Sequence, residues 1–441
     1  MKSFIQTLKN IWKIEDLRTR IVYTLGIILL YRLCSYVTLP GINPAELANL
    51  KSQTSTGILN ILDMFSGGAF SNASIVALGI MPYISASIMV QLLGIAVPFF
   101  QKLQREGESG RRKINQITRY LTVVILLLQG PTYLINLSHQ IPSLGEFYTF
   151  GNKAFHTIIL LSGTLFIMWL GERITEKGIG NGISMIIMVG IIARLPISLV
   201  QEFAWRLEAT SGGLVVFLVE IVAWIVVIAL SVLLVQGVRK IPVQYAKRIV
   251  GNKQYGGVRQ YIPLKVNASG VMPIIFAQAI MMVPITLAGF ASSDTASGFV
   301  VAFSNITGFW YNFVNAFLIV IFTYFYTAVT INPTQMAEDM KRNGGFIPGV
   351  KPGKKTVEYL DSIMSKITLP GSLFLAFVAI MPAFARIFGI SNQFAQFFGG
   401  TTLLIMVGVV LDTLQQIESH LLMRHYDGLM KSGRIKGRSG S

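Results

Sequence analysis

The sequence ILDMFSGGAFSNASIVALGIMPYISASIMVQLL, residues 61–93, carries the strongest structural signal in this chain. It contains a short apolar segment at 61–65, a break at Ser66-Gly67-Gly68, and the start of a longer apolar segment at 74–96. A helix needs about 20 apolar residues to cross a bilayer, so only the longer segment can span. The short segment is either an ordinary surface loop or a re-entrant piece, because irregular backbone survives at membrane depth only inside protein or beside water.

The composition is that of an integral membrane protein. Hydrophobic residues make up 52% of the 441 residues and charged residues only 13%, whereas soluble domains carry about 25% charged residues. Lys and Arg number 37 and Asp and Glu number 20, which gives a net charge of +17. Cys34 is the one cysteine in the sequence, so a disulfide bond within the chain is excluded.

Ten apolar runs are long enough to span a bilayer, and they predict an all-α polytopic membrane protein. They lie at 21–37, 74–96, 117–137, 155–171, 183–200, 214–237, 270–290, 309–330, 369–388 and 397–414. Most lysines and arginines fall before the first run, after the last run or in alternate loops. The positive-inside rule therefore places both termini in the cytoplasm. We expect an amphipathic surface helix at 1–20, without a cleavable signal peptide, and a basic cytoplasmic tail at 415–441.

The ten runs divide into two halves of five, at 21–200 and 214–414, joined by an external hinge loop at 201–213. The second run follows the Gly67-Gly68 break, and the seventh carries Gly270 and Pro273 near its start. Interrupted segments at matching positions indicate an inverted repeat with the functional path between the halves. A proline within a span can equally be a tolerated kink.

Two long loops of the second half, 239–265 and 331–368, are rich in Lys, Arg and Gly. Alternating residues around Tyr245 and glycines in the middle of the first loop predict a β-hairpin-like projection. Both loops are longer than a connection between neighbouring helices requires. Their charge either serves membrane orientation alone or forms a docking surface for a large acidic partner.

The sequence contains no recognisable catalytic or metal-binding motif. The histidines are His139, His156, His420 and His425. They fall toward opposite faces of the membrane and cannot form one metal site. Intramembrane acids are scarce, which disfavours an ion-coupled solute transporter, and a polytopic enzyme is less favoured still. Ile80 with Ile84, and Ile183 with Ile187, recur at helical spacing, which is typical of ordinary packing and also of a hydrophobic constriction in a pore.

Several motifs match one family in the same order along the chain. They are MFSGGAF at 64–70, ALGIMPYISAS at 77–87, EGESGRRK at 106–113, WLGERITEKGIGNGIS at 169–184, YAKR at 245–248, PLKVN at 263–267, FIPGVKPG at 346–353 and FGGTTLLI at 398–405. In these motifs the chain resembles the SecY/Sec61-alpha family of protein-conducting channels. The resemblance extends over nearly the whole chain, and the motifs are highly specific when taken together.

The resemblance implies a clamshell of two pseudo-symmetric, inverted five-helix halves around an hourglass pore, with neither enzymatic activity nor a cofactor. Such a pore passes unfolded secretory proteins and releases transmembrane segments laterally into lipid. The residues that match its constriction ring are Ile80, Ile84, Ile183, Ile187, Ile275 and Ile405. The residues that match the sealing plug lie at about 57–72 and include Met64, Phe65, Ser66, Gly67 and Gly68. Gln91 and Asn181 match polar positions near the lateral gate, and Gly67-Gly68 is expected to be the hinge on which the plug leaves.

The two basic loops resemble the docking site for the ribosome and the SecA motor ATPase. The basic residues expected there are Arg239, Lys240, Lys247, Arg248, Lys253, Arg259, Lys351, Lys354 and Lys355. The resemblance also implies the small membrane subunits SecE and SecG, signal sequences, translocating polypeptides and lipid as partners, in the bacterial cytoplasmic (inner) membrane. Lys351 stands where the family usually has arginine, so the charge is kept but the planar bidentate fork is lost.

Overall fold

The computed structural model describes most of the chain. The described residues are Trp12, 14–43, Leu47, 63–141, 149–208, 213–245, 248–250, 253–255, 259–267, 269–288 and 308–431. Only the last part of the expected surface helix at 1–20 falls within them, and there the first long helix already begins at Glu15. The first part of the expected plug, 57–62, lies outside them.

The chain divides into two compact units. Unit 1 comprises Met1–Ser198 with Val409–Ser441, and unit 2 comprises Leu199–Gly408. The first boundary falls beside residue 200, where the sequence places the end of the first half. The second boundary divides the last long helix between the two units.

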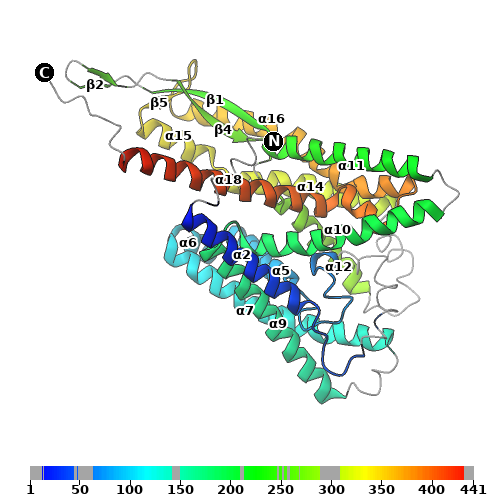
Figure 1. Ribbon diagram of the computed structural model, residues 1–441. Helices are drawn as coiled ribbons and strands as arrows, with labels where there is room; N and C mark the ends of the chain where they lie inside the picture. Colours follow the sequence, from blue (N-terminus) through cyan, green and yellow to red (C-terminus); the bar gives the residue numbers. More distant parts are fainter. Residues whose placement is uncertain are drawn as a thin grey trace. The chain divides into compact units, whose positions relative to one another are not determined.

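Unit 1 is built from helices (Figure 1). They are α2 (Glu15–Cys34), α5 (Met81–Ala96), α6 (Pro98–Arg105), α7 (Glu108–Gln140), α9 (Phe150–Lys177), and α10 (Gly182–Glu208) as far as Ser198. Helix α7 packs against α5, α6 and α9, and α2 packs against α9. A buried cluster that includes Phe70, Tyr133 and Leu160 joins the glycine-rich part of the chain to α7 and α9.

The second expected span, 74–96, is helical only from Met81 onward. Residues 66–80 form consecutive turns instead, and Gly67, Gly68 and Gly79 adopt positive φ. Pro82 lies in the first turn of α5, where the backbone N–H that proline lacks has no helical partner in any case. The irregular segment is therefore longer, and the helix shorter, than the apolar run indicated.

Unit 2 contains the remaining helices and all the named strands. The helices are α11 (Gly213–Gln236), α12 (Met272–Ala288), α14 (Phe309–Thr330), α15 (Pro333–Arg342), α16 (Lys354–Ile387), α17 (Asn392–Ala395), the 3-10 helix η2 (Gln396–Phe398) and α18 (Gly400–Lys431) as far as Gly408. Helix α14 packs against α12 and α16. Its buried Thr323 hydroxyl donates to Ile319 O at 2.6 Å, so this polar group is satisfied within the helix, as a bilayer requires.

A helix overlaps each of the ten predicted spans, which confirms an all-α polytopic membrane protein. Within the described residues, seven helices are long and apolar enough to cross a membrane. Helices α5 and α6 would make an eighth span as a pair, but they are bent by 101° at the break between them.

The expected hinge loop at 201–213 is largely helical, because α10 continues to Glu208. Its sequence from Gln201 to Glu208 contains no Gly or Pro, and most of its residues tolerate a helix well. Residues 209–212 lie outside the described part, and α11 begins at Gly213. Helix α18 likewise runs to Lys431, well beyond the expected end of the last span at 414.

The first basic loop forms the β-hairpin-like projection that its sequence predicted. Strands β1 (Val238–Tyr245) and β4 (Arg259–Lys265) pair antiparallel, with Val238 opposite Lys265. Strands β2 (Arg248–Val250) and β3 (Lys253–Tyr255) form a separate pair farther along the loop. Strand β5 (Gly345–Phe346), from the second basic loop, pairs with the other edge of β1. We call β1, β4, β5, α15 and residues 347–366 the basic module (Figure 1).

Candidate functional site: an anchored glycine-rich segment

The glycine-rich segment, residues 63–80, begins with a helical piece at 63–65 and continues as a compact series of turns. Gly68 N donates to Asp63 O at 2.9 Å, and Asn72 N donates to Gly68 O at 3.1 Å. The Ser66 hydroxyl donates to Asp63 O at 3.1 Å and accepts from Phe70 N at 3.1 Å. The expected plug residues Met64, Phe65, Ser66, Gly67 and Gly68 are all buried. The segment thus satisfies much of its own backbone, which permits irregular structure inside a membrane protein.

An ion pair fastens the segment to α10. Arg194 Nη2 donates to Asp63 Oδ2 and, at 3.0 Å, to the Ser71 hydroxyl. Asp63 Oδ1 accepts from Ser71 N at 2.8 Å. The side chain of Asp63 is only 2% exposed and that of Arg194 27% exposed. One guanidinium therefore contacts both ends of the turn that runs from residue 63 to residue 71.

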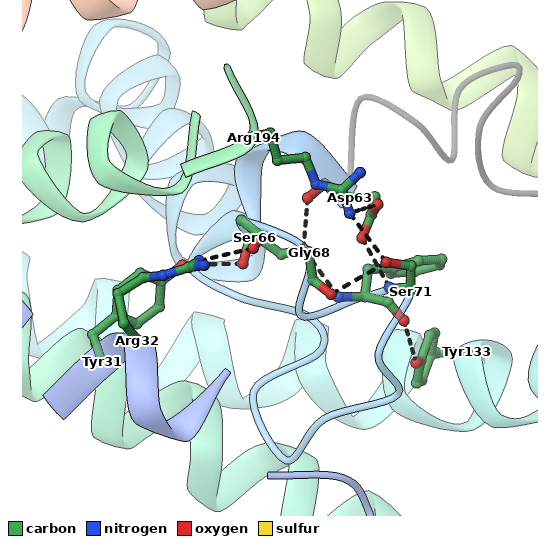
Figure 2. A network of polar contacts seen from close by, with 10 residues as sticks. Tyr31, Arg32, Asp63, Ser66, Gly68, Ser71, Tyr133 and Arg194 are labelled. Atoms are coloured by element: carbon green, nitrogen blue, oxygen red, sulfur yellow. Dashed lines mark hydrogen bonds and ion pairs between the residues drawn. The ribbon is translucent and has the colours of Figure 1, made fainter. Parts of the chain in front are cut away.

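Helices α2 and α7 hold the segment at other points (Figure 2). The Tyr31 hydroxyl donates to Ser66 O at 3.1 Å, and Arg32 Nη1 donates to Gly67 O at 2.8 Å. The Tyr133 hydroxyl donates to Phe70 O at 3.0 Å, and the Tyr133 and Phe70 rings meet edge to face at 4.8 Å. Three helices of unit 1, α2, α7 and α10, thus bind a segment that does not itself form a spanning helix.

The backbone of the segment touches α10 directly at a pair of glycines. A Cβ placed on Gly67 would lie 2.8 Å from Gly190 Cα and 2.8 Å from Arg32 Nη1. Gly67 also has φ of +65°, a conformation that L-residues with a side chain rarely adopt. Both the approach to α10 and the local turn therefore require glycine at position 67.

The isoleucines that match the constriction ring all lie near the N-terminal ends of helices. In unit 1, Ile80 is the N-cap residue of α5, and Ile84 N donates to Ile80 O at 3.1 Å. Ile80 and Ile187 are buried, whereas Ile84 and Ile183 are half-buried. In unit 2, Ile275 of α12 is half-buried and Ile405 of α18 is buried.

The two expected gate residues have local partners. Gln91 Nε2 lies 3.4 Å from the Ser87 hydroxyl, one turn earlier in α5. Asn181 Oδ1 accepts from Ile183 N at 3.1 Å and from Ser184 N at 3.3 Å, so it caps the N-terminus of α10. The sequence interpretation missed this capping role, although Asn before an apolar helix is the usual signal for it.

The basic module joins the two basic loops through one apolar core. Ile241, Val243 and Leu264 of the sheet pack with Met340 of α15 and Leu360 of α16. On the surface of this module, the expected docking residues Arg239, Lys240, Lys351, Lys354 and Lys355 are exposed. The backbones of Arg248, Lys253 and Arg259 lie on β2, β3 and β4, and Lys247 is outside the described residues.

Comparison with known proteins places the chain in a family. The SecY family model matches residues 74–414. The protein translocase subunit SecY of Halalkalibacterium halodurans is 43% identical over 432 residues, covering 97% of this chain and 100% of the relative. The chain belongs to the SecY family. Because SecY is the channel subunit of a protein translocase, this SecY-family chain is a translocation channel subunit and not an enzyme.

Solved structures of the same fold agree with this placement of the SecY-family chain. A structure described as showing that the plug domain of SecY stabilises the closed state of the translocation channel matches with a TM-score of 0.60 and 17% identity, covering 91% of this chain and 92% of the other. Canine Sec61 in a ribosome-channel complex from the endoplasmic reticulum matches with a TM-score of 0.56 and 16% identity, at the same coverage.

The SecY-family chain also holds a buried ion triad that its sequence did not reveal. Arg206 Nη2 donates to Glu220 Oε1 and, at 2.9 Å, to Gly389 O. Arg206 Nε lies 3.3 Å from Glu202 Oε1, and Glu202 Oε2 accepts from Ser391 N at 3.0 Å. All three charged residues are buried. The triad ties the end of α10 to α11 and to the turn after α16.

Across the described residues, no group of three or more His, Cys, Asp or Glu side chains is placed to hold a metal ion. The two carboxylates of the triad face an arginine, and the carboxylate of the glycine-rich segment faces another. The site therefore offers hydrogen bonds, ion pairs and aliphatic surface. These groups suit the holding and release of a segment of polypeptide.

Proposed function

We propose that the glycine-rich segment is the plug of a protein-conducting pore and that six isoleucines form the constriction of that pore. The six are Ile80, Ile84, Ile183, Ile187, Ile275 and Ile405. One observation carries the proposal: a segment that forms turns instead of a spanning helix is folded, buried and anchored directly before α5, whose N-cap residue is Ile80. Aliphatic side chains can close around an extended polypeptide without hydrogen-bonding it, as a hydrophobic constriction requires.

The path of the cargo follows from this arrangement. Signal sequences open the channel, unfolded secretory proteins pass through it, and transmembrane segments leave sideways into lipid. Gln91, half-buried on α5, is the polar group that we assign to this lateral gate. Asn181 contributes there by capping α10, and thus by fixing the start of the helix that carries Ile183 and Ile187.

The basic module is the docking site for the partners that supply the cargo and the driving force. These partners are the ribosome and the SecA motor, and the small subunits SecE and SecG complete the membrane complex. Ribosomal RNA is a dense polyanion, and exposed lysines gain affinity for it by releasing counterions. The exposed Arg239, Lys240, Lys351, Lys354 and Lys355 supply this charge. The relation to Sec61 in a ribosome-channel complex supports the same role.

The chain belongs in the bacterial cytoplasmic membrane with both termini in the cytoplasm. The support is the distribution of charge, because lysines and arginines gather in the basic module and in alternate loops of the chain. The module then faces the compartment where ribosomes and SecA are found.

Crosslinking to a trapped cargo tests the pore. With Cys34→Ser as the background, Ile84→Cys, Ile187→Cys and Ile405→Cys are placed one at a time in the membrane complex, and a secretory protein is stalled during translocation. We expect each of the three cysteines to crosslink to the stalled chain. The matched control is Leu218→Cys on α11, whose side chain is 55% exposed on the surface of the unit.

Crosslinks at position 218 together with silence at the three isoleucine positions would overturn the pore assignment. A stalled chain that contacts only the unit 1 positions would limit the constriction to α5 and α10. Uptake of small solutes by the purified chain along an ion gradient would favour a secondary transporter instead.

A further inference from the structure

Asp63 is the one charged residue in the sequence of the glycine-rich segment, and its side chain is only 2% exposed. The segment places the two carboxylate oxygens differently. Oδ1 accepts from Ser71 N at 2.8 Å inside the segment, and Oδ2 faces Arg194 of α10. One carboxylate oxygen therefore stabilises the turn, and the other binds the turn to α10.

The other anchors of the segment differ in kind from this pair. Tyr31, Arg32 and Tyr133 all donate to backbone carbonyls, which water can satisfy equally well once the segment leaves. Asp63 instead carries a charge, and burial of a charge is tolerated only with a partner of opposite sign. Of the anchors within the described residues, the ion pair is thus the one that depends on two specific side chains.

Glycine makes room for the ion pair. A Cβ on Gly68 would lie 3.2 Å from Arg194 Nη2 and 3.5 Å from Arg194 Nε, and Gly68 has φ of +92°. The guanidinium therefore lies directly against the backbone of the segment at Gly68, between its bonds to Asp63 and Ser71. The segment therefore cannot move away from α10 without breaking the bonds of the Arg194 side chain to both Asp63 and Ser71.

We propose that the Asp63–Arg194 ion pair is the latch of the plug, and that its strength sets which signal sequences can open the channel. This proposal rests on the proposed function of the segment as a plug. A cargo must contribute enough binding free energy to separate Asp63 from Arg194, so weak signal sequences leave the channel closed. Asp63 and Arg194 are in this sense specificity-determining residues, although neither needs to touch the cargo.

Because Asp63 is more deeply buried than Arg194, replacing either residue alone should affect closure of the plug to a different extent. Arg194→Gln leaves the Asp63 carboxylate buried without a cation, whereas Asp63→Asn leaves a guanidinium that is 27% exposed and can be hydrated. Arg194→Gln should therefore open the plug more than Asp63→Asn does. Adding Asp63→Asn to Arg194→Gln should partly restore closure, because the unpaired charge is then removed.

The test uses the full membrane complex in proteoliposomes, with the resting ion leak and the transport of cargoes carrying strong or defective signal sequences as readouts. We expect Arg194→Gln to raise the resting leak by on the order of a hundredfold, as loss of one partner of a buried pair predicts. The same variant should accept defective signals. Arg173→Gln is the matched control, because Arg173 forms an exposed ion pair with Glu176 at 3.0 Å.

An unchanged leak and unchanged signal selectivity in Arg194→Gln would overturn the latch. A double variant that leaks more than Arg194→Gln alone would overturn it as well, because the two losses would then be independent. Failure of the wild-type complex to transport any cargo would instead contradict the proposed function itself. Melting of the complex, measured in parallel, identifies a variant whose leak comes from general unfolding.

Discussion

At the scale of single residues, Gly67 is a tightly constrained position of the glycine-rich segment. The sequence interpretation makes Gly67-Gly68 a flexible hinge, so replacing both with alanine should slow opening. The structure argues for the opposite effect of Gly67→Ala. Gly67 has φ of +65°, and a Cβ there would lie 2.8 Å from Gly190 Cα. These features belong to the anchored segment that the structure shows, so a side chain at position 67 destabilises the anchored form first.

We expect Gly67→Ala to favour the open channel and to raise the resting leak. The positive φ alone should cost about 1–2 kcal/mol in the closed form, before any contact with α10 is counted. Gly107→Ala is the matched control, because Gly107 has φ of +69° with nothing within 4 Å of an added Cβ. Slower opening of Gly67→Ala, with an unchanged leak, would restore the hinge interpretation.

At the scale of elements, α10 holds residues of three different sites, of which its sequence indicated only the isoleucine pair. Its first turns hold Ile183 and Ile187, Arg194 binds the glycine-rich segment, and its last two turns hold Glu202 and Arg206. Pro196 lies within the helix, where it removes a backbone hydrogen bond, and the Ser198 hydroxyl donates to Arg194 O at 3.1 Å. These two residues lie beside the boundary of the units at Ser198. Pro196 therefore weakens the backbone hydrogen bonding of α10 next to this boundary.

The buried triad should matter for the stability of unit 2. Arg206→Gln leaves Glu202 and Glu220 facing each other without a cation in a buried place, so we expect a loss of about 3 kcal/mol or more. Arg173→Gln breaks an exposed pair and should cost below about 1 kcal/mol. Thermal melting of the complex compares the two, and equal melting temperatures would contradict the structural importance of the triad.

Sequence reasoning succeeded where a pattern is local. Hydrophobic length located a helix in every predicted span, and alternation with glycines predicted the β1–β4 hairpin. It failed where partners are distant, since Arg206 meets Gly389 O across 183 positions and Arg194 meets Asp63 across 131. It also placed a loop at 201–208, where α10 continues, because a polar helical turn such as that containing Glu202 and Arg206 resembles a loop when hydrophobicity alone is counted.

At the scale of the whole molecule, part of the net charge of +17 is concentrated on the surface of the basic module. Exposed lysines and arginines project from the basic module, while its interior is apolar. Such a surface binds a polyanion with an affinity that falls as salt rises. Lys351 keeps a positive charge on this surface, but it lacks the planar fork with which an arginine can bind a phosphate through two hydrogen bonds.

We expect Lys354→Gln with Lys355→Gln to weaken binding of the complex to ribosomes. In a plot of the logarithm of the binding constant against the logarithm of the salt concentration, the magnitude of the slope should fall by roughly one unit for each lysine that contacts a phosphate. Arg111→Gln with Arg112→Gln removes the same charge from exposed positions of α7 and serves as the control. Equal losses in both pairs would show that net charge, rather than the basic module, governs ribosome binding.

The pairing of β5 with β1 has a consequence for the biosynthesis of this protein. Tyr245 lies opposite Gly345, and the module core extends from Ile241 to Met364. A nascent chain that has emerged only as far as the hairpin has the first basic loop but not the helices that complete its core. Any partner that recognises the finished surface must therefore wait until most of the chain has been synthesised, so a truncated product cannot compete for that partner.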